Sequence, residues 1–164
     1  MIKNPRVRVA KPRDVGLFRK LWKLFLEEQK EMGGVILPNE QNLEIFTNLF
    51  KIYTDPDPEE EAKLDGVVLF IGEVAVMMWG DPDVPIETTL GKTAYAYGIY
   101  VLPDNRQQGL SNLLHEEMMK RLKDLGFEHV QGTILESNDS GMKASKRGTG
   151  NTKNLPDRPV YARI

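Results

Sequence analysis

The sequence contains no cysteine and only two histidines, and this lack excludes several kinds of site. Without thiols the chain has neither a disulfide framework nor a thiolate metal centre. His115 and His129 have no second ligand at metal spacing, so we expect no metal site and place both histidines at the surface or rim of the fold. The absence of cysteine is compatible with a reducing compartment, and we expect a cytoplasmic protein.

Long apolar runs and a strong net charge are missing as well. The longest apolar runs, VVLFI and VAVMMW, are too short to cross a bilayer, and the first residues lack the apolar run of a signal peptide, so we expect no membrane partner. A net charge of -2 does not favour nucleic acid. Basic residues gather between 143 and 163, but only Tyr161 is aromatic there, so a nucleic-acid-binding domain is the weakest of three functional hypotheses.

What is present is an ordinary globular composition. The chain has 164 residues, of which 40% are hydrophobic and 28% are charged. This length suits one domain with a sizeable core, and we assign residues 1–164 to a single domain.

Apolar periodicity predicts the elements of that domain. Strands are expected at 6–11, 66–71, 74–80, 94–102, 129–135 and 159–164. Helices are expected at 15–32, with Asp14 as N-cap and Gly33 as its stop, at 39–53, between Gly109 and Gly126, and at 137–147. The order is β-α-α-β-β-β-α-β-α-β, which indicates an α/β or α+β fold with a mixed, mostly antiparallel, twisted sheet flanked by helices.

The stretch VLPDNRQQGLSNLLHEEMMK, residues 101–120, carries the strongest functional signal. A polar loop with one glycine leads into an amphipathic helix. The first turn of a helix has free N–H groups and a partial positive charge, so it attracts anions such as phosphate. Gly109 lets the backbone approach a ligand closely, and Arg106 adds a full charge. The alternative is an ordinary turn between a strand and a helix.

In its wider context this loop resembles motif A of the GNAT superfamily, the acetyl-CoA-dependent N-acyltransferases. The family pattern is Gln/Arg-x-x-Gly-x-Gly/Ala after a strand that ends near Val-x-Pro. This chain has YVLPDNRQQGLS, with Ser111 in place of the last Gly or Ala. The expected order of elements is similar to that of the family over most of the chain.

The resemblance implies a site for acetyl-CoA. The backbone N–H groups of Gln107, Gln108, Gly109, Leu110 and Ser111 would hold the pyrophosphate. Ile99 and Val101 would pair their backbone with the pantetheine arm and help to polarise the thioester carbonyl. Asn138 would contact the same arm, although a helix cap explains this residue equally well.

The acid–base residues of the reaction are less clear. Many family members carry a carboxylate on the strand before motif A, where this chain has Tyr95 and Tyr97. By alternation these tyrosines share a face with Ile99 and Val101, and they either contact substrate and water or simply pack on the sheet. The usual tyrosine acid is absent from the helix after Asn138, and only Ser145 is left to relay a proton.

The leading hypothesis is therefore an N-acetyltransferase in which a primary amine attacks acetyl-CoA directly. The amine is carried by a small molecule or a peptide, and Glu27, Glu28 and Glu31 either attract it or form a solvated helix face. The alternative is a GNAT-fold protein that binds CoA without catalysis and has a regulatory or structural role. A homodimer is a further expectation.

Overall fold

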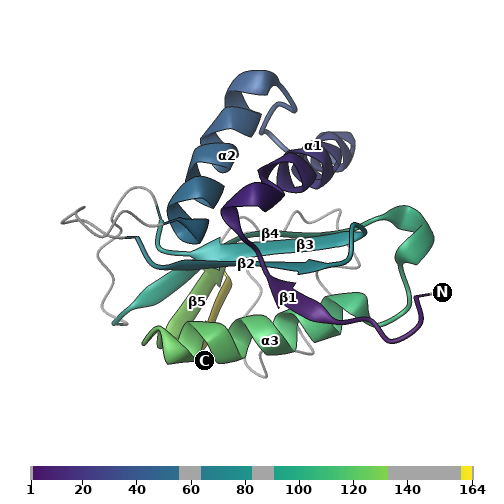
Figure 1. The fold of residues 1–164 in the computed structure, drawn as a ribbon. Helices are drawn as coiled ribbons and strands as arrows, with labels where there is room; N and C mark the ends of the chain where they lie inside the picture. Colours follow the sequence, from purple (N-terminus) through teal and green to yellow (C-terminus); the bar gives the residue numbers. More distant parts are fainter. Residues whose placement is uncertain (1, 56–63, 83–90, 133–159, 164) are drawn as a thin grey trace.

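The computed structural model describes residues 2–55, 64–82, 91–132 and 160–163, which form a sheet with helices on both faces (Figure 1). Six strands follow one another across the sheet in chain order. They are β1 (Val7–Val9), β2 (Gly66–Ile71), β3 (Ala75–Gly80), β4 (Thr93–Val101), β5 (His129–Gly132) and β6 (Val160–Arg163). All neighbours are antiparallel except β4 and β5, which are parallel.

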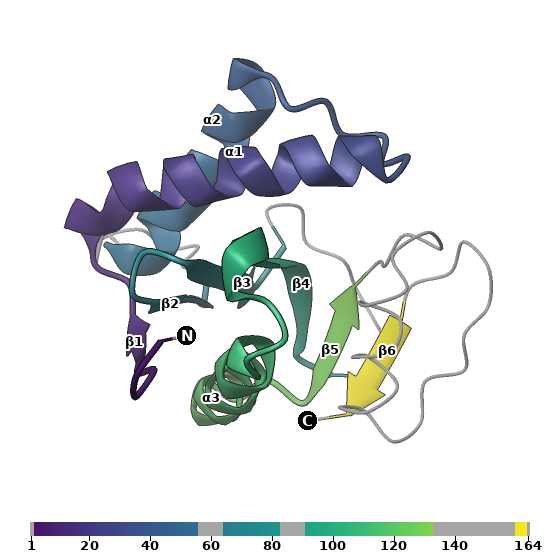
Figure 2. The ribbon, with the colours of Figure 1, turned by 90° about the vertical axis from the view of Figure 1, so that its right-hand side faces the viewer.

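Three α-helices and two short 3₁₀ helices complete the described part of the chain. They are η1 (Pro12–Asp14), α1 (Val15–Glu31), α2 (Glu40–Thr54), η2 (Pro103–Asn105) and α3 (Leu110–Asp124). Helices α1 and α2 lie on one face of the sheet and α3 lies on the other (Figures 1 and 2). Helix α3 makes the crossover that a parallel pair such as β4 and β5 requires. The mixed, mostly antiparallel fold class is confirmed, while the helix expected at 137–147 lies outside the described residues.

The end of α1 and the start of α2 are each closed by local hydrogen bonds, and the stop of α1 at Gly33 was predicted. Gly33 has a φ of +92° directly after α1, and the N–H groups of Gly33 and Gly34 bond back to carbonyls of the last turn. Asn39 is the N-cap of α2, and its side chain accepts a hydrogen bond from the N–H of Asn42 at 2.9 Å. These contacts satisfy backbone groups that a helix end would otherwise leave unpaired.

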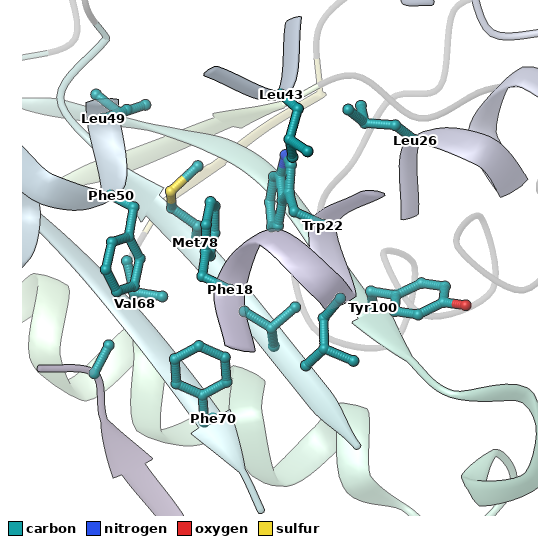
Figure 3. Packing of buried hydrophobic residues seen from close by; sticks show 13 residues of the cluster. Phe18, Trp22, Leu26, Leu43, Leu49, Phe50, Val68, Phe70, Met78 and Tyr100 are labelled. Carbon is teal, nitrogen blue, oxygen red and sulfur yellow. The ribbon is translucent and has the colours of Figure 1, made fainter. Parts of the chain in front are cut away.

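Two apolar clusters, one on each face of the sheet, hold these layers together. The α1/α2 cluster lies between the sheet and helices α1 and α2 (Figure 3). It contains Ala10, Phe18, Leu21, Trp22, Leu26, Leu43, Leu49, Phe50, Val68, Phe70, Val76, Met78 and Tyr100. The α3 cluster contains Val67, Leu69, Ile71, Ala75, Met77, Trp79, Ala94, Leu110, Leu114, Met118, Leu122, Phe127 and Val130.

Strands β2 and β3 read as continuous apolar runs because they serve both clusters. Successive side chains of a strand point to opposite faces, so Val68 enters the α1/α2 cluster and Leu69 enters the α3 cluster. Burying one such side chain stabilises the fold by about 1.5–3 kcal/mol before entropy is counted. The two central strands therefore fix the sheet against which β4 is positioned.

Candidate functional site

Strand β4 contains a β-bulge near its centre. Its register with β3 pairs Gly98 with Met78 and Ala96 with Trp79, so Tyr97 is an extra residue with no partner of its own in β3. A bulge inserts one residue and bends the strand locally, so that the alternation of side chains changes at that point. Glycine inside a strand is a sequence signal for such a bulge, and Gly98 follows the extra residue directly.

The bulge overturns one expectation about the tyrosines. Alternation predicts that Tyr97 shares a face with Ile99 and Val101. In the structure Tyr97 packs against the α1/α2 cluster, whereas Ile99 and Val101 pack against the α3 cluster. The prediction was wrong because period-two alternation holds only along an uninterrupted strand. Tyr95 and Tyr97 do stay together, with ring centroids 5.0 Å apart.

The part of β4 after the bulge directs backbone groups away from β3. The N–H of Leu102 donates to the carbonyl of Val74 at 2.8 Å. In an antiparallel pair, residues bonded to the partner strand alternate with residues that are not, so every second residue before Leu102 also bonds to β3. The N–H and C=O groups of Ile99 and Val101 therefore point toward the opposite edge of β4. Among the described residues, β5 pairs with that edge from Thr93 to Ala96.

The loop between η2 and α3 presents a row of backbone N–H groups close to this edge. Gly109 and Gln107 are both in the left-handed region, with φ values of 74° and 60°. Within the described ranges, no group accepts a hydrogen bond from the backbone N–H groups of residues 107–111. The next two, those of Asn112 and Leu113, donate to the Gly109 carbonyl. Such a run of unpaired amides at a helix start is a seat for an anion.

The side chains of the loop fix it in place while its amides stay open. Leu110 is buried in the α3 cluster. The side-chain oxygen of Gln108 accepts a hydrogen bond from the backbone N–H of Ile2 at 3.1 Å. A Cβ atom added at Gly109 would meet nothing within 4 Å. The loop is thus anchored by its neighbours and leaves space for a ligand beside Gly109.

Arg106 is committed to protein groups. Its Nε donates to the carbonyl of Val101 at 2.9 Å, and its Nη2 pairs with the carboxylate of Glu28 in α1. The guanidinium carbon lies 5.7 Å from the centroid of the Tyr100 ring. Burial raises the pKa of the Tyr100 phenol above its usual value, and the Glu28 carboxylate adds to this shift. The positive charge of Arg106 is therefore balanced by Glu28.

Of the remaining candidate residues, the structure describes Tyr97 but not Asn138 or Ser145. The Tyr97 hydroxyl donates to the backbone carbonyl of Asp81 at 3.3 Å, on the α1/α2 side of the sheet. Asn138 and Ser145 lie outside the described residues, so the structure does not place them. Within residues 2–55, 64–82, 91–132 and 160–163, no cluster of acidic residues and histidines is suited to hold a metal ion.

In the same ranges, no helix is long and apolar enough to cross a membrane. A strand whose backbone groups at Ile99 and Val101 point away from β3, followed by a helix start with unpaired amides, is suited to an elongated ligand with an anionic group.

No protein-family model matches the sequence, and no curated protein matches it either. Solved structures do match. The PaiA N-acetyltransferase of Thermoplasma acidophilum, in complex with coenzyme A, has a TM-score of 0.64 and 10% identity, and the match covers 99% of this chain and 100% of that one. The GNAT domain of PAT from S. lividans has a TM-score of 0.68 and 14% identity, with coverages of 98% and 90%.

A third similar structure is AAC(6')-Iy in complex with the bisubstrate analogue CoA-S-monomethyl-acetylneamine. Its TM-score is 0.67 and its identity is 13%, and the match covers 95% of this chain and 97% of that one. Together these similarities show that the chain has the fold of the GNAT acetyltransferases. The fold that the RQQGLS motif and the order of elements predict is thereby confirmed.

Sequence reasoning missed the contacts that tie the loop to distant segments. Ile2 and Gln108 are 106 positions apart, and Glu28 and Arg106 are 78 positions apart. No local pattern reports such pairs, because each partner looks like an ordinary surface residue by itself. Gly98 in the sequence is a local signal for the bulge, whereas no local sequence pattern indicates the Ile2–Gln108 and Glu28–Arg106 contacts.

Proposed function

We propose that this chain is an N-acetyltransferase that moves an acetyl group from acetyl-CoA to a primary amine by direct attack. The observation that supports this best is the row of backbone amides at 107–111 that are unpaired among the described residues, at the start of α3. Two structures with the same fold contain coenzyme A or a CoA-based bisubstrate analogue, which supports the same cofactor here.

The described residues fit two parts of the cofactor. The amides of residues 107–111 would hold the pyrophosphate, helped by the partial positive charge at the start of α3. The outward backbone groups of Ile99 and the N–H of Val101 would pair with the pantetheine arm in the manner of an added strand. The Val101 carbonyl already accepts from Arg106, so Ile99 offers the arm both a donor and an acceptor. Asn138 is proposed to contact the same arm.

Acetyl-CoA supplies an activated thioester. In the transfer a bond forms between the amine nitrogen and the acetyl carbon, and the bond from that carbon to sulfur breaks. The amine must lose a proton, and the leaving thiolate must gain one. Tyr95 and Tyr97 are proposed to contact the acceptor or a water that takes its proton. Ser145 is proposed to relay a proton to the thiolate.

Two measurements test this function. We expect calorimetry to detect binding of acetyl-CoA at micromolar concentrations, and absence of binding at high micromolar ligand would exclude the CoA site. Release of free thiol over a panel of amines then separates an enzyme from a protein that only binds. Binding without thiol release for any amine would favour the non-catalytic alternative.

Gly109 provides the sharpest variant for the cofactor site. We predict that Gly109→Asp weakens acetyl-CoA binding by about 100-fold or more. Two like charges about 4 Å apart repel by about 4 kcal/mol near a protein surface, and the new carboxylate would face the pyrophosphate. Calorimetry on the variant measures the change in Kd.

Gly109→Asn is the matched control for that variant. Asparagine has the same shape as aspartate, carries no charge and tolerates the left-handed conformation that Gly109 adopts. We expect it to fold and to bind acetyl-CoA within about tenfold of the wild type, because the charge repulsion is absent. Equal affinities of the Asp and Asn variants would mean that no anion sits beside Gly109.

A further inference from the structure

Arg106 connects α1, which lies far away in the sequence, to the end of β4 and to the loop that follows η2. Its Nε donates to Val101 at the end of β4, and its Nη2 bonds to Glu28 near the end of α1. The residue itself follows η2 directly and begins the turn that leads into the 107–111 loop. One side chain thus joins the proposed cofactor loop, the strand that borders it and the helix on the opposite face of the sheet.

The geometry of the guanidinium gives this connection its precision. The group is planar with its donors at fixed angles, so a bond to Val101 and a bond to Glu28 together fix its orientation. The ring of Tyr100, 5.7 Å from the guanidinium carbon, limits it on a third side. The Arg106 and Glu28 side chains are 40% and 30% exposed, and ion pairs of this exposure add little to stability. The main effect of this contact is therefore to fix the position of α1 relative to β4 rather than to stabilise the fold.

We propose that Arg106 is a positioning residue that holds the end of α1 against the end of β4, and that the cofactor phosphates bind to the backbone amides alone. This inference rests on the proposed function. The unpaired amides at 107–111 are free to receive an anion, whereas the Nε and Nη2 atoms of Arg106 already donate to Val101 and Glu28.

The contacts of Arg106 with Val101 and Glu28, called here the Arg106 bridge, affect both sides of the sheet. On the cofactor side it occupies the Val101 carbonyl, so the pantetheine arm is restricted to Ile99 and the Val101 N–H. On the other side it fixes the last turn of α1, which leads into the loop after Gly33 and carries the acidic residues Glu27, Glu28 and Glu31. Loss of the bridge would loosen the acceptor side and leave the anion seat intact.

The test compares Arg106→Gln, Glu28→Gln and the double variant by calorimetry with CoA and by thiol release with an amine. We expect each single variant to lower kcat/KM for the amine about tenfold and to keep the Kd for CoA within about threefold. We expect the double variant to be no worse than either single variant, because all three changes remove the same contact.

A second ion pair on the surface supplies the control. Arg121 and Glu117 form an ion pair on α3, with side chains 46% and 28% exposed, close to the values for Arg106 and Glu28. Arg121→Gln and Glu117→Gln remove the same charges without touching the proposed site. We expect both to leave the kinetics and the Kd for CoA unchanged.

The opposite role for Arg106 predicts a different pattern. If its guanidinium bound the phosphates, Arg106→Gln would raise the Kd for CoA tenfold or more, and Glu28→Gln would lower that Kd more than threefold by releasing the arginine. That result would overturn the positioning role while leaving the proposed function intact. The calorimetric comparison needs no turnover, and Glu28→Gln decides the question even if Arg106→Gln does not fold. A wild-type protein without affinity for CoA would overturn the proposed function, and this inference with it.

Discussion

At the scale of single residues, His115 shows how packing alters the chemistry of a side chain. It lies half-buried on α3 with its ring edge-on to Trp79, the two centroids being 5.4 Å apart. Burial lowers the pKa of the imidazole, and the nearby Glu116 opposes this shift. The half-buried position agrees with the rim that the sequence predicts, and the direction of the pKa shift follows from that burial in the folded chain.

We predict that the protein loses stability as the pH falls below about 6.5, the ordinary pKa of histidine. The folded-state pKa of His115 is below that of the unfolded chain, so the unfolded chain takes up the proton first. The contribution is complete above the unfolded pKa and declines as the pH drops toward the lower folded value. Urea unfolding between pH 7.5 and 5.5 measures this slope.

His115→Gln is the comparison for that measurement. The variant has no group at position 115 that titrates in this range, so its stability should depend less steeply on pH. The Asp14 carboxylate does not interfere, because its hydrogen bonds with Arg8 hold its pKa below the usual value and its effect appears in more acidic solution. Identical slopes in the wild type and the variant would contradict the assignment to His115.

Asp14 also shows the limit of a local signal. The sequence predicts it as the N-cap of α1, and it does occupy that position. Its side chain, however, accepts hydrogen bonds from the Arg8 guanidinium and from the N–H of Lys11, and makes no bond to the first turn of α1. The 3₁₀ turn η1 in front of the helix takes up the carboxylate, and the sequence pattern did not reveal that turn.

At the scale of elements, the last turn of α2 is fitted to a gap between two glycines. Gly66 of β2 lies opposite Gly80 of β3. The ring of Tyr53 fills the space beside them, since a Cβ on Gly66 would lie 2.4 Å from that ring. The Tyr53 hydroxyl donates to the carbonyl of Asp81. The absence of two side chains is therefore what allows α2 to pack on this end of the hairpin.

We predict that Gly80→Ala destabilises the protein. The added Cβ would lie 2.5 Å from the Cα of Gly66 and 2.7 Å from the carbonyl oxygen of Asp65, and neither backbone atom can turn aside as a side chain would. Overpacking of this kind typically costs about 1–3 kcal/mol. The free energy of unfolding in urea measures the loss.

Gly16→Ala makes the same chemical change at an open position. Gly16 lies in the first turn of α1, and an added Cβ would meet nothing within 4 Å. Alanine is favoured over glycine in helices by roughly 0.5–1 kcal/mol, so this control should be neutral or slightly stabilising. Equal effects of the two substitutions would show that the close approach at Gly80 has no energetic consequence.

At the scale of the whole molecule, the two apolar clusters share the sheet that separates them. The chain contains two tryptophans, and they report on different clusters. Trp22 is fully buried in the α1/α2 cluster and Trp79 is buried in the α3 cluster. Because β2 and β3 contribute side chains to both clusters, disruption of one removes support from the other.

We predict that both faces unfold together, as expected of a single domain. In Trp22→Phe the remaining fluorescence reports the α3 cluster, and in Trp79→Phe it reports the α1/α2 cluster. Within each variant, the urea midpoint from fluorescence should coincide with the midpoint from far-UV circular dichroism. A separation of the two midpoints in either variant would contradict a single cooperative unit.

Local signals in the sequence predict the order of the described elements and the position of the loop that we propose as the anion seat. Helices α1 and α2 and the β2–β3 hairpin follow from apolar periodicity, caps and glycine turns, all of which are local signals. The start of α3 directly after Gly109 follows in the same way. These features depend on neighbours a few positions away, so a single sequence is enough to predict them.

Only the tertiary structure decided how the site is assembled. The bulge at Tyr97 separates the tyrosines from Ile99 and Val101, and the bridge from Arg106 to Glu28 turns an expected phosphate ligand into a proposed positioning residue. Both results depend on registers and contacts between segments far apart in the chain. Many pairings of such segments satisfy the same local pattern, and only the packing of the sheet between its two clusters selects one of them.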